Sequence, residues 1–180
     1  MLFIHEMGHI MIAKYYKYEV SEVTIFPFGF YARISNLDYA SKYELLMIML
    51  GGLSMHLLFY YFFIFIYYID LISISYYEYL QNINLSILMF NMIPIYPLDG
   101  SRCLFSILRI FFNYKISKII IYLLSFVIIF FLFCYANISL RIVLILLCTL
   151  NIKDILNFDY QRVEYLYYKE KDFNVKKNNV

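Results

Sequence analysis

Long apolar stretches without a single Asp, Glu, Lys or Arg dominate the chain. Three of them, Leu45–Ile69, Tyr79–Leu98 and Ile119–Leu140, contain about the 20 residues that a helix needs to cross a bilayer. Residues 1–16 and Ile142–Ile152 are shorter apolar segments, and the first resembles the second half of a spanning helix. We therefore predict an all-α polytopic membrane protein with about five transmembrane segments.

Composition agrees with a membrane setting. Hydrophobic residues make up 63% of the 180 residues and the mean hydropathy is +0.69, well above the values of a soluble domain. The net charge is only +2 and no basic stripe is present, so we expect no nucleic-acid partner. Cys103, Cys134 and Cys148 lack CxxC spacing and are expected to be buried free thiols.

The placement of charges predicts an orientation. Lys and Arg residues gather in the connections Lys14–Glu44 and Ser101–Lys118, whereas the connection Asp70–Asn82 has none. The positive-inside rule places the first two in the cytoplasm and the third outside. We expect a membrane core at residues 1–152, followed by a cytoplasmic tail at residues 153–180.

The motif HEMGH near the start carries candidate chemistry. On a helix, His5 and His9 are one turn apart and share a face, so both can bind one metal ion. Glu6 lies beside them, where it can take a proton from a bound water and pass it to a leaving amine. Zinc lowers the pKa of such a water to about 7. Because three polar groups without a role would be costly in lipid, we predict a metallopeptidase.

A catalytic zinc site usually has a third protein ligand. A histidine six residues after His9 is excluded, because Tyr15 stands there. Glu19, Glu22 and His56 are conceivable ligands, although His56 is better interpreted as a hydrogen-bonded polar residue between helices.

Asp99 is the better candidate for the third ligand. It closes the stretch Tyr79–Leu98 at its predicted cytoplasmic end, at a depth similar to that of His9. Pro94 and Pro97 are expected to interrupt regular helix just before it, leaving irregular backbone that is tolerated at membrane depth where it lines a polar cavity.

Two segments, HEMGH and NMIPIYPLDG, resemble the two signatures of the site-2 protease family of intramembrane zinc metalloproteases. The segments VTIFPFGFYARI, GGLSMHLLF and NLSILMFNMIPIYPLDGSR follow in the order and spacing of the sporulation members of that family. The resemblance runs from residue 1 to about residue 168. It implies an endopeptidase that cuts a substrate within or near the substrate's membrane segment.

The resemblance also implies roles for single residues. His5, His9 and Asp99 would bind Zn²⁺, with Glu6 as the catalytic base and acid. The segment VTIFPFGFYARI corresponds to a small re-entrant β-hairpin that guides the substrate. The expected substrate-binding residues are Asn91, Pro94, Phe28 and Gly29.

Partners and location follow from the same resemblance. The sporulation members release a sigma factor from its membrane-associated pro-form, so a pro-sigma factor is the candidate substrate and membrane regulatory proteins are candidate partners. The expected location is a bacterial cell membrane, for which the outer forespore membrane is a candidate, with the active site near the cytoplasmic side. The first helix of the family would lie before residue 1, and residues 153–180 are too short for the nucleotide-sensing CBS domain of relatives.

Two other functions remain as alternatives. A metal transporter would also place histidines and carboxylates in membrane helices, although it would need further polar residues along a path to the outer face. An inactive membrane scaffold could retain the whole metal site. Replacing Glu6 with Gln distinguishes both from a protease, because only proteolysis depends on that carboxylate.

Overall fold

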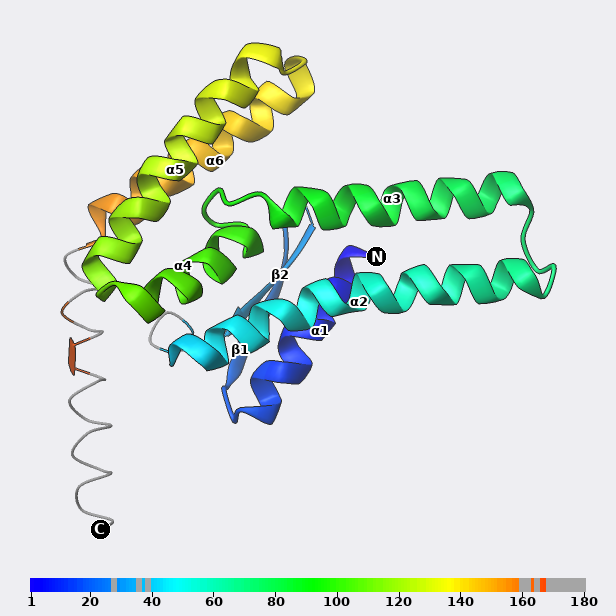
Figure 1. The fold of residues 1–180 in the computed structure, drawn as a ribbon, viewed down its shortest axis with the longest axis horizontal. Helices are drawn as coiled ribbons and strands as arrows, with labels where there is room; N and C mark the ends of the chain where they lie inside the picture. The colour runs from blue at the N-terminus through cyan, green and yellow to red at the C-terminus, as the bar shows by residue number, and fades with distance from the viewer. Residues whose placement is uncertain (27–28, 35–36, 38–39, 159–162, 164–165, 168–180) are drawn as a thin grey trace, which may run out of the picture. The chain divides into compact units, whose positions relative to one another are not determined.

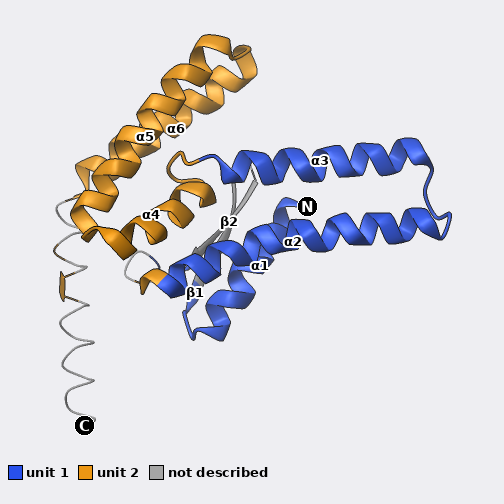
Figure 2. Cartoon of the chain, in the orientation of Figure 1, with its two compact units in different colours: residues 1–37, 43–93 blue, residues 38–42, 94–180 orange. Residues whose placement is uncertain are grey.

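The computed structural model of the chain describes residues 1–26, 29–34, 37, 40–158, 163 and 166–167. Six helices and two strands are assigned within these residues (Figure 1). The chain forms two compact units, residues 1–37 with 43–93 and residues 38–42 with 94–180 (Figure 2). In chain order the elements are α1 Leu2–Tyr15, β1 Val20–Phe26, β2 Gly29–Ile34, α2 Lys42–Tyr68, α3 Ile74–Met92, α4 Asp99–Phe111, α5 Tyr114–Tyr135 and α6 Ile138–Leu156.

In the first unit, α2 and α3 form a pair of long helices side by side (Figure 1). The Gln81 amide donates a hydrogen bond of 3.1 Å to the Tyr60 carbonyl, which links the two helices. Ser73 caps α3 by accepting a hydrogen bond from the Tyr76 amide. His56 of α2 and Asn84 of α3 are hydrogen-bonded to each other between the two helices, and His56 also contacts His5 of α1.

The two strands of the first unit pair antiparallel. Val20 lies opposite Ile34, Phe26 lies opposite Gly29, and the register is irregular between Val20 and Glu22. Both strands contact α1. A re-entrant position of these strands in a membrane stays a prediction, and Phe28 lies outside the described residues.

The second unit consists mainly of α4, α5 and α6. Figure 1 shows α5 and α6 side by side, and α4 contacts α5 at its base. The side chains of Asn113 and Asn137 cap α5 and α6, each accepting a backbone hydrogen bond of 2.9 Å. Phe105 of α4 packs edge-to-face on Tyr114 of α5, with 5.5 Å between the ring centroids.

Helix boundaries match the apolar stretches in part. Helix α3 ends at Met92 and α4 begins at Asp99, so regular helix is interrupted around Pro94 and Pro97, as predicted. Helix α3 begins before the predicted stretch, and α6 continues to Leu156. Two described helices, α2 and α5, are long and apolar enough to cross a membrane. The total of about five transmembrane segments stays a prediction.

Candidate metal centre

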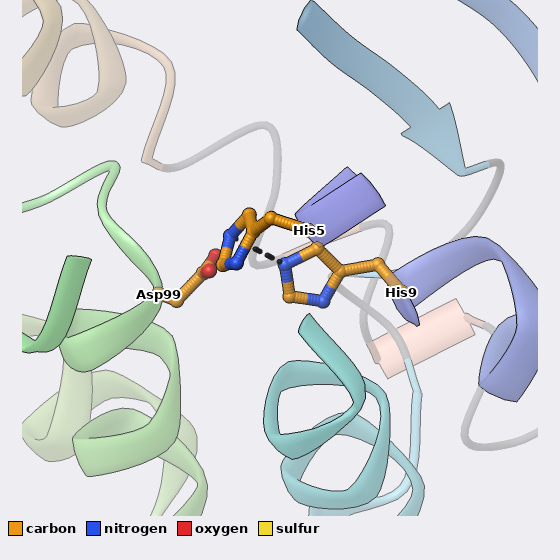
Figure 3. A group of neighbouring side chains, drawn as sticks. All are labelled: His5, His9 and Asp99. Carbon is orange, nitrogen blue, oxygen red and sulfur yellow. Dashed lines mark hydrogen bonds between the residues drawn. The ribbon is translucent and has the colours of Figure 1, made fainter. Parts of the chain in front are cut away.

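Helix α1 positions two histidines of the HEMGH motif on one buried face. His5 is 3% exposed and His9 is 4% exposed. Their Nε2 atoms are 3.2 Å apart. The dashed line in Figure 3 joins the two rings at these atoms. Two nitrogens bound tetrahedrally to one zinc ion at 2.0–2.1 Å would be about 3.3 Å apart. The two rings therefore already lie at the spacing of two ligands of one zinc ion.

A backbone carbonyl assigns the tautomer of His9. Its Nδ1 atom lies 2.8 Å from the carbonyl oxygen of Ile48 in α2. A carbonyl can only accept, so Nδ1 carries the proton and donates. In the neutral ring Nε2 is then the atom with the lone pair, as a metal ligand requires.

The tautomer of His5 follows from a longer chain of hydrogen bonds. The Asn84 amide nitrogen donates to the His56 carbonyl at 2.9 Å, which leaves its oxygen facing the His56 Nδ1 atom at 2.8 Å. His56 must therefore donate from Nδ1 and accept at Nε2. The His5 Nδ1 atom lies 3.1 Å from that acceptor and donates to it. The neutral His5 ring, like that of His9, then has its lone pair on Nε2.

These tautomers suit a cation between the two rings. Two lone pairs that face each other at 3.2 Å repel, and a proton or metal ion between them removes the repulsion. Donation of each Nδ1 proton to a fixed acceptor is the usual outer support of a metal-bound histidine. The chemistry of these donors fits zinc.

Glycines let α1 and α2 approach closely at this point. A Cβ atom on Gly51 would lie 2.7 Å from the Gly8 carbonyl oxygen. One on Gly52 would collide with the His9 ring and lie 2.9 Å from Cε1 of His5. Only glycine at position 52 leaves room for both imidazoles.

Glu6 lies on α1 next to His5 and is half-buried. The helical rotation of about 100° per residue sets its side chain beside the face that carries the two imidazoles. A carboxylate there has the acid–base chemistry expected from the motif.

Asp99 is the first residue of α4, in the second unit, and is half-buried. The backbone before it forms a turn in which the Leu98 amide donates to the Ile95 carbonyl at 2.8 Å. The positive end of the helix dipole favours a carboxylate at this position. Burial, with a smaller contribution from Asp99, raises the pKa of the Cys103 thiol to about 12, so that thiol stays neutral at pH 7. Asp99 is drawn with the two histidines in Figure 3.

The other expected site residues lie as follows. Asn91 is half-buried in the last turn of α3, and Pro94 is half-buried just after that helix. Gly29 begins β2 opposite Phe26. Among the alternative ligands, Glu19 is exposed and the Glu22 side chain lies outside the described part of the chain.

Asn84 is a functional candidate that the sequence reasoning missed. It is 3% exposed and its amide orders both His56 and, through it, His5. The sequence does contain a signal for it. Asn84 is a polar residue in the uncharged stretch Tyr79–Leu98, which is long enough to cross a membrane, and polar groups in such segments usually serve a function.

Comparisons with known proteins agree with this chemistry. The profile of peptidase family M50 matches residues 1–74 and 68–135. The chain is 28% identical over 102 residues to stage IV sporulation protein FB of Bacillus subtilis (strain 168). That alignment covers 57% of this chain and 35% of the Bacillus protein, so the chain spans about a third of its relative's length.

Proposed function

Because this chain belongs to peptidase family M50, we propose that it is a zinc-dependent endopeptidase that cleaves a membrane-associated protein near the cytoplasmic face of the membrane. Members of the family are membrane metalloproteases, and α2 and α5 have the length and composition to cross a bilayer. The observation that carries the proposal is the pair of facing Nε2 atoms of His5 and His9, with each Nδ1 held by a fixed acceptor.

Asp99 is our proposed third ligand. Its carboxylate suits zinc, and it is half-buried at the start of α4. His56 is a weaker candidate, because one of its ring nitrogens donates to Asn84 and the other accepts from His5. Glu19 is also a weaker candidate, because it lies beyond the end of α1 and its side chain is exposed.

Zinc held by the proposed ligands would lower the pKa of a bound water to about 7. In this proposal Glu6 would take a proton from the attacking water and then donate it to the leaving amine. His5 and His9 hold their orientation through their Nδ1 protons during the reaction.

We propose that Asn91 and Pro94, together with Phe28 and Gly29, bind the substrate in extended form. An extended strand exposes the scissile amide, which helical hydrogen bonds would otherwise shield. The resemblance to sporulation members favours a pro-sigma factor as the substrate, membrane regulatory proteins as partners and the outer forespore membrane as the location.

A cleavage assay tests the proposal. The full chain is co-expressed with a membrane-tethered pro-sigma factor, and cleavage is compared between wild type, Glu6→Gln, Asp99→Asn and the control Glu78→Gln, an exposed carboxylate of α3. Glu6→Gln should lower cleavage by about 10²- to 10⁴-fold while zinc stays bound. Asp99→Asn should lose both cleavage and zinc affinity, and the control should match wild type.

Other outcomes would contradict the proposal. Full cleavage by Glu6→Gln would refute Glu6 as the catalytic base. Unchanged zinc affinity in Asp99→Asn would refute Asp99 as a ligand. No cleavage by a zinc-loaded wild type would refute the pro-sigma factor as the substrate.

A further inference from the structure

A buried ion pair lies between α5 and α6 in the second unit. The Lys118 ammonium is 2.8 Å from a carboxylate oxygen of Asp154, and the two residues are only 5% and 7% exposed. Removing two charges from water is costly, and replacement by apolar residues is often neutral or stabilising. Such a pair in an apolar helix pair therefore calls for a role other than stability.

The Asp154 carboxylate also binds two tyrosines. Tyr122 of α5 donates to the same oxygen as Lys118, at 2.7 Å. Tyr96 donates to the other oxygen, at 3.0 Å. The Lys118 ammonium in addition lies 5.2 Å from the centre of the Tyr96 ring. Both members of the charged pair therefore contact Tyr96, which lies in the loop that leads to Asp99.

The backbone of Tyr96 is bound by the same two helices. Its amide donates to the Ser125 hydroxyl of α5 at 3.0 Å. Its carbonyl accepts from the Asn151 amide of α6 at 2.6 Å. Pro94 and Pro97, on either side of Ile95 and Tyr96, have no N–H groups and cannot donate backbone hydrogen bonds in this segment.

Tyr96 is connected to Asp99 by a short, ordered path. Ile95 beside it is 1% exposed, and its carbonyl accepts from the Leu98 amide at 2.8 Å. Asp99 follows at once as the first residue of α4. A shift of Tyr96 would therefore be transmitted to the Asp99 backbone.

We propose that the Tyr96 anchor, which we define as Tyr96 with Lys118, Tyr122, Ser125, Asn151 and Asp154, positions Asp99 for metal binding. The anchor touches neither metal nor substrate and acts through Asp99 alone. This inference rests on the proposed function, since it assigns Asp99 to the metal site.

Tyr96→Phe is the most selective test, because it removes only the hydroxyl that reaches Asp154. The full chain is purified in detergent, and its zinc affinity is measured by competition with chelators of graded strength. We expect about tenfold weaker zinc binding, the lower end of the effect of outer-sphere partners. Tyr135→Phe, at a tyrosine of α5 that is 91% exposed, is the matched control and should bind zinc like wild type.

A double variant covers the case in which Tyr96→Phe does not fold. Lys118→Met with Asp154→Leu removes both charges together, so neither stays buried without its partner. We expect the metal-free protein to remain folded, although the Tyr96 and Tyr122 hydroxyls lose their acceptor, and zinc affinity to fall by a similar factor. Wild-type zinc affinity in a folded Tyr96→Phe or in the double variant would overturn the inference.

Asp99→Asn separates the anchor from the metal site. If Asp99→Asn keeps wild-type zinc affinity, the proposed ligand set fails. If it loses affinity, Tyr96→Phe added to Asp99→Asn should cause no further loss, because the anchor acts through that carboxylate. A further loss of about tenfold in the combined variant would instead mark a general structural role and overturn the inference.

Discussion

At a buried neutral histidine, the nitrogen that carries the proton decides whether the ring can bind a metal ion at the other. In this protein an amide 28 residues from His56 makes that choice, since Asn84 orients His56 and His56 orients His5. The tautomer of His9 depends on the Ile48 carbonyl alone. The two proposed ligands therefore have different hydrogen-bond partners that fix their tautomers.

Replacing Asn84 with Leu tests this support. His56 loses its acceptor and its carbonyl loses a donor, so the His5 tautomer is no longer fixed. We expect zinc affinity to fall by about 10- to 100-fold. The free energy of unfolding should also fall by about 1–3 kcal/mol, because buried polar atoms are left unsatisfied. Chelator competition and detergent unfolding measure the two effects.

Asn82→Leu is the matched control, because Asn82 is exposed on the same helix. It should bind zinc like wild type. If Asn84→Leu binds zinc with the same affinity as this control, then the hydrogen-bond chain does not set the ligand tautomer.

Local spacing explains which site residues could be predicted at this scale. His5 and His9 are separated by one helical turn, so their shared face follows from the sequence alone. His5 depends on Asn84 through His56, in two contacts between residues 51 and 28 positions apart. Tyr96 depends on Asp154, which lies 58 positions away. No local period encodes such contacts, although polar residues in apolar stretches mark where to look.

The crossing of α1 and α2 is set by glycine. Gly52→Ala places a Cβ atom against the His9 ring and 2.9 Å from Cε1 of His5. We expect the imidazoles to be displaced and zinc affinity to fall by more than about tenfold. Ser54→Ala, which changes an exposed residue of the same helix, should leave zinc affinity unchanged. Wild-type zinc binding by Gly52→Ala would show that the close approach is dispensable.

Apolar runs predicted some elements better than others. Helices α2 and α5 coincide largely with uncharged stretches. Each stretch is long enough to cross a bilayer, so its length and composition predict the helix. Most of helix α4 lies in the segment Ser101–Lys118, whose charges indicate only a basic connection. Arg102 and Arg109 break its apolar run, and a helix with polar and apolar positions intermixed leaves no long uncharged signature.

For the whole molecule, charge placement predicts a membrane topology. The turn between α2 and α3 contains no Lys or Arg, whereas the segment from Ser101 to Lys118 has four of them and no acid. We expect alkaline phosphatase inserted after Ser73 to be active and a green fluorescent protein inserted after Asn113 to fluoresce. The controls exchange the two reporters. Alkaline phosphatase inserted after Asn113 should be inactive, and green fluorescent protein inserted after Ser73 should not fluoresce. Reversed activity would contradict the orientation, and with it the cytoplasmic active site.

The most direct test of the account is the coordination of zinc in the purified full chain, measured by X-ray absorption together with metal content. We predict one zinc ion per chain, bound by two imidazole nitrogens at about 2.0–2.1 Å and otherwise by oxygen. Asp99→Asn should weaken binding without removing either imidazole. Zinc bound through sulfur, or through a single imidazole in the wild-type chain, would contradict the ligands that we propose, His5, His9 and Asp99.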